Sequence, residues 1–245
     1  MQAQIVEQIQ ERFVDGLRGA TIAGLNVTIP FKERALALAD RSDALAKASG
    51  AANLLLFGED GSIEARNTDG EGLLGALRAR APGLDLTSGP TLVFGAGGAA
   101  RAAAAALLGA GSPEVRIVNR TLDRAQALVD QLGAKVRAFD ALHAGAAADD
   151  SVAVVNATSL GLGGGKGPAI SWSALPKSAV VMDMVYKPLR TEFLLAAANH
   201  GHLTVDGLGM LIRQAIPSYA AFFGSAPPEE VDARTLLLTE LGLAG

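Results

Sequence analysis

Residues 91–101 form the sequence Thr-Leu-Val-Phe-Gly-Ala-Gly-Gly-Ala-Ala-Arg, in which a short apolar run passes through glycines into alanines. The run predicts a buried strand over 91–94, and the alanines predict a helix over 99–108. The turn between them fits the pattern G-x-G-x-x-A of dinucleotide-binding loops, and unpaired N–H groups at the helix start would face the phosphates. We therefore expect a dinucleotide at Gly95, Ala96, Gly97, Gly98 and Ala99. The alternative is an ordinary strand-turn-helix corner whose glycines serve packing.

After this turn the sequence alternates between apolar runs and amphipathic segments. Strands are expected over 115–118, 135–138, 152–155, 180–182 and 203–205, and helices over 121–132, 140–147 and 190–200. Strands that alternate with helices favour βαβ units and a parallel sheet. The sequence thus predicts an α/β fold with a Rossmann-like domain.

The chain before residue 81 is organised differently. Strands are expected over 24–29, 53–57 and 62–66, the last two as a hairpin, and helices over 4–18, 34–47 and 71–80. Proline and glycine residues in 81–90 are typical of a linker. Two further helices, over 210–223 and 229–241, follow the alternating part. Two α/β domains are therefore expected.

The composition excludes several classes of protein. The 245 residues carry a net charge of −4, with three histidines and no cysteine. A dedicated nucleic-acid binder is usually basic, and a disulfide or a cysteine-based metal site needs cysteine. The sequence shows neither a membrane-spanning apolar stretch nor a signal peptide, so we expect a soluble, cytoplasmic protein without nucleic-acid or membrane partners and without a bound metal.

The end of the second expected strand of the Rossmann-like part indicates which dinucleotide binds. An NAD site usually carries Asp or Glu about 20 residues after the glycines. This chain has Asn119-Arg120-Thr121 instead, followed by Arg124. A guanidinium can pair with a 2′-phosphate, so we expect NADP rather than NAD. Alternatively, Arg120 and Arg124 are solvated charges at the start of a helix.

Two loops in the first part of the chain carry candidate catalytic groups. Lys32 lies just after the strand expected over 24–29, and Asp69 just after the strand expected over 62–66. Strand ends commonly border a cleft, where a Lys–Asp pair could hold a substrate hydroxyl and move its proton. The alternative is a surface lysine and a turn-forming aspartate, since most such residues are simply solvated.

With these residues, the chain resembles the shikimate dehydrogenase family, whose members use NADP to interconvert 3-dehydroshikimate and shikimate. The resemblance covers roughly residues 17 to 240, with the motifs in the family's order. They are Asn26-Val-Thr-Ile-Pro-Phe-Lys32, Gly50-Ala-Ala-Asn53, Asn67-Thr-Asp-Gly70, Gly95-Ala-Gly-Gly-Ala-Ala-Arg101, Asn119-Arg-Thr121, Asn156-Ala-Thr-Ser159, Asp183-Met-Val-Tyr186 and Asp206-Gly-Leu-Gly-Met-Leu-Ile-Arg-Gln-Ala215.

The resemblance implies a division of the chain and a set of site residues. It implies a substrate-binding domain over 1–70 plus 207–245 and an NADP-binding Rossmann-like domain over 71–206. Lys32 and Asp69 would be catalytic. The substrate would lie against Asn26, Thr28, Asn53, Tyr186 and Gln214. The cofactor would contact, besides the glycine loop, Asn119, Arg120, Thr121, Arg124, Thr158, Ser159, Met184, Gly207 and Met210.

One departure from the family pattern concerns the N-terminus. The family normally begins with a strand, a Ser-x-Ser segment that grips the substrate carboxylate, and a helix, all of which this sequence lacks. The substrate domain is therefore expected to be incomplete there. Three explanations remain open. Either the start is truncated or misassigned, or the chain is a short member that completes its sheet through a partner chain, or it is a relative with a changed substrate. The substrate could then be quinate or another small polyol acid, or the chain could be an NADP-binding protein with an inactive substrate site. The protein could be a monomer or a homodimer.

Overall fold

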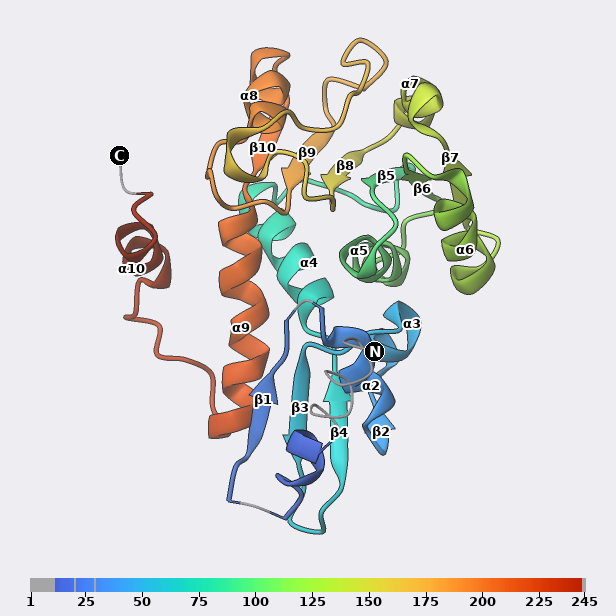
Figure 1. Ribbon diagram of the computed structural model, residues 1–245. Helices are drawn as coiled ribbons and strands as arrows, with labels where there is room; N and C mark the ends of the chain where they lie inside the picture. Colours follow the sequence, from blue (N-terminus) through green and yellow to red (C-terminus); the bar gives the residue numbers. More distant parts are fainter. Residues whose placement is uncertain (1–11, 20, 29, 244–245) are drawn as a thin grey trace.

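The computed structural model describes residues 12–19, 21–28 and 30–243, which contain two β-sheets joined by helices (Figure 1). The larger sheet has six parallel strands in the order β10-β9-β8-β5-β6-β7. They are β5 (Thr91–Phe94), β6 (Val115–Val118), β7 (Val136–Phe139), β8 (Ala153–Asn156), β9 (Val180–Asp183) and β10 (Leu203–Val205). The chain leaves β5 in one direction and returns at β8 in the other, so a crevice for a ligand is expected at the carboxyl ends of these two strands.

Helices cover both faces of this sheet, as continuous apolar parallel strands require. They are α5 (Gly98–Gly109), α6 (Leu122–Leu132), α7 (Ala144–Ala148) and α8 (Glu192–Asn199), with short 3₁₀ turns at Ala141–His143 and Leu162–Gly164. One buried cluster joins α5 and α6 to the sheet, and another joins α7 and α8 to the opposite face. Five of the seven alanines of α5 are buried, which lets this helix lie close to the strands.

The smaller sheet has the strand order β1-β3-β4-β2. Its strands are β1 (Gly24–Asn26), β2 (Arg41–Ser42), β3 (Leu54–Phe57) and β4 (Ile63–Arg66), and the helices α2 (Lys32–Ala37) and α3 (Ala44–Ser49) lie beside it. Strands β3 and β4 form the expected antiparallel hairpin, while β2 pairs with β4 in parallel. Within the described part of the chain, β1 pairs only with β3, so its other edge is open.

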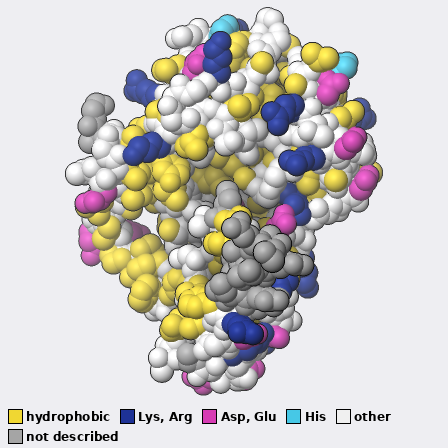
Figure 2. Space-filling model, viewed as in Figure 1, with side chains coloured by type: hydrophobic (Ala, Val, Ile, Leu, Met, Phe, Trp, Pro, Cys, Tyr) yellow, Lys and Arg dark blue, Asp and Glu magenta, His cyan; other side chains and the backbone are white. Residues whose placement is uncertain are grey.

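Two long helices connect the sheets (Figure 1). Helix α4 (Asp69–Arg80) begins at the smaller sheet and buries Leu73 and Leu77 in the core of the larger one. Helix α9 (Gly207–Phe223) packs along α4, and a last helix, α10 (Ala233–Glu240), lies to one side of it. In Figure 2, hydrophobic side chains gather at the lower left, along the side where α9 and β1 lie in Figure 1.

The structure confirms the Rossmann-like parallel sheet, and every strand expected after residue 90 forms close to its predicted place. The helix expected over 34–47 is wrong, because the segment forms α2, β2 and α3 instead. Two aspartates interrupt it. Asp40 accepts a hydrogen bond from the Ile63 N–H at 2.7 Å, and Asp43 caps α3 by accepting from the Ala46 N–H at 2.6 Å.

Other expectations differ in extent only. The strand expected over 24–29 ends at Asn26, and the helix expected over 229–241 begins at Ala233. Most of the helix expected over 4–18 lies outside the described residues, although residues 12–15 are helical. Among the helices of the described residues, none is long and apolar enough to cross a membrane.

Candidate active site

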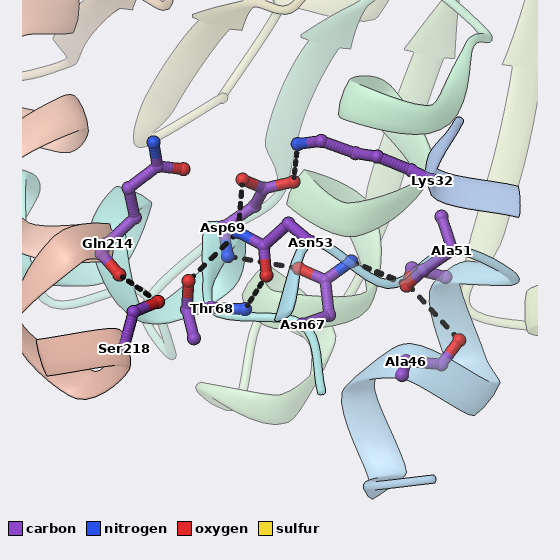
Figure 3. Close-up of polar contacts among 10 residues, drawn as sticks. Lys32, Ala46, Ala51, Asn53, Asn67, Thr68, Asp69, Gln214 and Ser218 are labelled. Carbon is purple, nitrogen blue, oxygen red and sulfur yellow. Dashed lines mark hydrogen bonds and ion pairs between the residues drawn. The ribbon is translucent and has the colours of Figure 1, made fainter. Parts of the chain in front are cut away.

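The structure brings Lys32 and Asp69 together (Figure 3). Lys32 Nζ lies 2.6 Å from Asp69 Oδ2, with the lysine side chain 23% exposed and that of the aspartate 6% exposed. The two residues open α2 and α4, which is why each side chain reaches the same point from a different element. Asp69 also stands at the start of its helix, where the helix dipole favours a negative charge. The lysine side chain remains partly accessible while the carboxylate is held inside.

Asn53 fixes the orientation of Asp69. Its Nδ2 donates to Asp69 Oδ1 at 3.0 Å and to Thr68 Oγ1 at 2.9 Å, and its Oδ1 accepts from the Thr68 N–H at 2.8 Å. Both amide hydrogens are therefore used within the protein, and one lone pair of Oδ1 is left for a ligand. One carboxylate oxygen of Asp69 thus faces Asn53 and the other faces Lys32.

A second asparagine supports this turn from behind. Asn67 Oδ1 accepts from the Asp69 N–H at 3.0 Å, and its Nδ2 donates to Ala51 O at 2.8 Å and to Ser49 Oγ at 3.0 Å. All these groups are buried, so each hydrogen bond prevents the cost of an unpaired polar group. Asn67 stands in the motif Asn67-Thr-Asp-Gly70, but no sequence pattern indicates this supporting role.

Gln214 reaches the site because α4 and α9 lie unusually close. A Cβ at Gly72 would lie 2.8 Å from Gln214 Cβ and 2.8 Å from Met210 O, so only glycine permits this contact. Gly72 is one turn beyond Asp69, and Gln214 lies beside Asp69 in Figure 3. The side-chain amide of Gln214 makes no hydrogen bond within the described part of the chain, so it is available to a substrate.

The other expected substrate residues are not bonded to the pair within the described part of the chain. Asn26 and Thr28 are exposed around the end of β1, where the Val27 N–H donates to Asn53 O at 2.8 Å. Tyr186, 37% exposed, lies on the loop after β9. Among the described residues, no hydrogen bond links these three side chains to Lys32 or Asp69.

A cavity of 480 Å³ next to β1 is a different place from this cluster. Asn26 and Thr28 lie on its border, but Leu25, Val27, Phe31 and other apolar side chains form most of its wall, and neither Lys32 nor Asp69 lines it. An apolar cavity offers few partners to the hydroxyls of a polyol. The cavity therefore does not define the substrate site.

The glycine loop has the backbone that a dinucleotide needs. Gly95 has φ +110°, which favours glycine, and a Cβ there would lie 3.1 Å from Thr158 Cγ2. At Gly97 and Gly98 a Cβ would meet open space, so these positions leave room for a ligand at the N-terminus of α5. Ala96 and Ala99 complete the loop and are half-buried. The residues present fit a bound pyrophosphate.

The expected 2′-phosphate clamp lies at the carboxyl end of β6, next to β5. Asn119 Nδ2 donates to Thr121 O at 2.8 Å and so shapes the turn into α6. Arg120, Thr121 and Arg124 are exposed, and neither arginine forms an ion pair within the described residues. Their guanidinium groups are thus free to bind a phosphate.

A buried network holds the loops opposite the glycine turn. Asp183, fully buried at the end of β9, accepts from Asn156 Nδ2 at 2.9 Å, from the Val185 N–H at 3.0 Å and from Thr191 Oγ1 at 2.6 Å. Asn156 Oδ1 in turn accepts from Thr158 Oγ1 at 2.7 Å. Burial raises the pKa of Asp183, although the three hydrogen bonds oppose that shift. This network positions Thr158, and it leaves Ser159 exposed beside it.

The residues expected beside the nicotinamide also meet. A Cβ at Gly207 would overlap the backbone carbonyl of Met184, so the start of α9 touches the loop after β9. Met184 and Met210 are both half-buried and pack against the same hydrophobic cluster. The structure thus brings Met184 and Gly207 into contact, and Met210 lies one turn further along α9.

Sequence reasoning missed Arg101, which ties the glycine-loop helix to the helix of Lys32. Arg101 Nη2 lies 3.0 Å from Glu33 Oε1, and a Cβ at Gly50 would lie 2.6 Å from Arg101 Nη1. The arginine stands in the quoted glycine motif and Glu33 follows Lys32. No local pattern links two residues so far apart in the sequence.

Comparisons with known proteins agree with this geometry. A family model described as the shikimate dehydrogenase substrate binding domain matches residues 2–55, and one described as shikimate / quinate 5-dehydrogenase matches residues 78–161. The chain is 58% identical to shikimate dehydrogenase (NADP(+)) of Caulobacter vibrioides over 95% of its own length and 81% of that relative.

Solved structures give the same picture. A shikimate 5-dehydrogenase from Thermus thermophilus in complex with NADP(H) and shikimate superposes with a TM-score of 0.77 at 36% identity, covering 89% of this chain and 79% of that one. A quinate dehydrogenase from Corynebacterium glutamicum in complex with NAD gives 0.83 at 32% identity, covering 95% and 82%.

Proposed function

Because the chain belongs to the shikimate dehydrogenase family, we propose that Lys32 and Asp69 carry out the proton transfer of that family's reaction. The chain is an NADP-dependent oxidoreductase that interconverts 3-dehydroshikimate and shikimate. The observation that carries the catalytic assignment is the 2.6 Å contact between Lys32 Nζ and Asp69 Oδ2, accessible on the lysine side and buried on the aspartate side.

The pair would work in both directions. When shikimate is oxidised, its reacting hydroxyl loses a proton, and the pair accepts it. When 3-dehydroshikimate is reduced, the ammonium of Lys32 donates a proton to the developing alkoxide. Asp69, held by Asn53 at 3.0 Å, stabilises the charged lysine and keeps its Nζ aimed at the substrate. Hydride transfer at the carbon is the chemistry that the nicotinamide supplies when bound.

The remaining predicted residues would position the two ligands. Gln214 has an unused amide beside Asp69, and Asn53 is bonded to Asp69, so the polar groups of these two residues, with those of Asn26, Thr28 and Tyr186, would bind the ring hydroxyls. The glycine loop would hold the pyrophosphate, and Asn119, Arg120, Thr121 and Arg124 the 2′-phosphate. Thr158, Ser159, Met184, Gly207 and Met210 would border the dinucleotide.

The test is an NADPH absorbance assay with shikimate and NADP⁺. Lys32→Ala and Asp69→Asn should each lower kcat by about 10²- to 10⁴-fold, the usual contribution of a positioned acid or base. NADP⁺ binding should stay close to that of the unchanged protein. Lys47→Ala is a matched control, because Lys47 is an exposed lysine on the neighbouring helix α3. Equal losses of kcat and NADP⁺ affinity would contradict the assignment.

The same assay separates the alternatives. Quinate, tested beside shikimate, is the second substrate, because one matching family model covers both acids in its description. Turnover of quinate above that of shikimate would move the assignment to quinate. NADP⁺ binding without turnover of either acid would mean that the substrate site is incomplete.

Three further properties belong to the same proposal. The protein would act in the cytoplasm, which fractionation of its host cell tests. It would be a monomer or a homodimer, which light scattering distinguishes. The substrate domain would comprise 1–70 plus 207–245 and the NADP domain 71–206. Protection from hydrogen exchange on adding NADP⁺ should concentrate in 71–206, and protection spread evenly over both parts would contradict that division.

A further inference from the structure

Four arginines converge on the side of the molecule away from Lys32 and Asp69. Two adjoining cavities, of 440 and 340 Å³, share Arg80, Asp206 and Arg234 in their walls. Arg190 lines the first and Arg213 the second. These residues come from the end of α4, the loop before α8, and helices α9 and α10, which surround this region in Figure 1.

The charges in these cavities are not balanced. Asp206 is engaged by Arg234, whose Nη2 lies 2.7 Å from Oδ2 and whose Nη1 lies 3.1 Å from Oδ1. Arg80, Arg190 and Arg213 form no ion pair within the described residues. Three unpaired guanidinium groups around a concave surface attract anions, in a chain whose net charge is −4.

The packing holds one of these guanidinium groups over the cavity. A Cβ at Gly75 would lie 2.8 Å from Arg213 Cδ, and one at Gly209 would lie 3.8 Å from Arg213 Nη1. Gly75 thus makes room for the arginine on α4, while Arg213 Nη1 donates to Gly209 O of α9 at 3.4 Å. Arg80, at the other end of α4 from Asp69, is about 16 Å along the helix axis from that residue. The cluster is therefore separate from the Lys32–Asp69 site.

We propose that Arg80, Arg190 and Arg213, beside the Arg234–Asp206 pair, form a binding site for a small multivalent anion bearing phosphate or carboxylate groups. The planar guanidinium binds either group through two parallel hydrogen bonds. The cavity of 440 Å³ has the volume of an ordinary small-molecule site. This proposal does not depend on the function assigned to Lys32 and Asp69.

The test titrates pyrophosphate and, separately, citrate into the protein saturated with NADP⁺, at constant ionic strength, and follows the melting temperature and the heat of binding. Saturating NADP⁺ is needed because Arg120 and Arg124 are themselves expected to bind phosphate. We expect saturable binding of at least one probe. Arg80→Ala/Arg190→Ala should weaken it by at least about tenfold, the effect of losing roughly one charged hydrogen bond.

Two control variants make the test decisive. Arg78→Ala removes another exposed arginine of α4 that lines neither cavity, and it should leave binding unchanged. Arg120→Ala should also leave it unchanged. Binding of pyrophosphate alone would assign phosphate chemistry, and binding of citrate alone carboxylate chemistry. The proposal is overturned if neither probe binds saturably or if the double variant binds as well as the unchanged protein. It is also overturned if Arg120→Ala loses binding while the double variant keeps it.

Discussion

Arg101 in α5 forms an ion pair with Glu33 in α2 at 3.0 Å, and Glu33 directly follows Lys32. One arginine of the glycine motif thus contacts the helix that presents Lys32. The Gln131 amide, which donates to Ala48 O at 3.0 Å, is a second link between the same two parts of the molecule. Side-chain contacts, as well as the connecting helices, therefore fix the position of Lys32 relative to the dinucleotide loop.

Arg101→Ala should disturb the placement of Lys32 relative to the dinucleotide loop more than it lowers the stability of the fold. The Glu33 side chain is 67% exposed, so the ion pair contributes at most about 1 kcal/mol to the free energy of unfolding. We expect kcat to fall several-fold, because small displacements of a catalytic group are costly. A double-mutant cycle with Glu33→Gln measures the coupling in kcat and in urea unfolding. Additive effects on kcat would contradict the role.

Gly72→Ala should disturb substrate binding through Gln214. The added methyl would push α9 away from α4, so we expect a loss of about 1–3 kcal/mol of stability, the usual cost of overpacking. The KM for shikimate should rise more than the KM for NADP⁺. Gly75→Ala is the matched control, since its new methyl would meet only the flexible side chain of Arg213. Equal behaviour of the two variants would refute the argument.

Arg120→Ala should weaken NADP⁺ far more than NAD⁺. A charged hydrogen bond contributes about 1.5–3 kcal/mol, which corresponds to roughly 10- to 100-fold in affinity. NAD⁺ lacks the 2′-phosphate, so its affinity should hardly change. Kd values for both cofactors, measured by tryptophan fluorescence or calorimetry, check this. If the ratio of the two affinities stays the same, Arg120 is not part of the clamp.

The protein should become less stable as the pH falls below the ordinary pKa of histidine, about 6.5. Burial, together with the charge of Lys177, lowers the pKa of His202, which is 5% exposed and lies 5.9 Å from the Trp172 ring. The unfolded chain takes up the proton near the ordinary pKa of about 6.5, and the folded chain only at lower pH. The stabilising contribution is therefore complete above pH about 6.5 and is lost progressively below it.

Melting temperatures between pH 8 and pH 5 measure this effect. His202→Gln should flatten the decline relative to the unchanged protein, even if it melts at a lower temperature throughout, because glutamine does not titrate. An equal decline in both proteins would show that other groups cause it.

The parallel sheet was predictable because its signals are local. Three apolar residues before Gly95 and a run of alanines after it specify strand, turn and helix without help from distant residues, and the structure has these elements at Thr91–Phe94 and Gly98–Gly109. The segment 34–47 was not predictable in the same way. Its helical pattern competes with hydrogen bonds that Asp40 accepts from the Ile63 N–H and Asp43 from the Asn67 N–H, which exist only in the folded chain.

The same distinction applies to the site. Lys32 and Asp69 could be singled out because each follows a strand, and the structure brings them within 2.6 Å. The supporting roles of Asn67 and Arg101 depend on contacts with Ala51 and Glu33, which lie on other elements. A pattern in the sequence names the residue types of a site, whereas the groups that orient them become visible only through tertiary contacts.

The two connecting helices have a thermodynamic consequence. Helix α4 begins at Asp69, which is bonded to Asn53 just before β3 of the smaller sheet, and buries Leu73 and Leu77 in the core of the larger sheet. Helix α9 contacts Met184 at its start, Gly207, and Gly24 of β1 near its end, through Phe222. Neither sheet can unfold without exposing buried apolar surface of both helices to water. The chain should therefore unfold in one cooperative transition, with equal calorimetric and van't Hoff enthalpies, and a ligand that binds only beside the larger sheet should raise the melting temperature of the whole molecule.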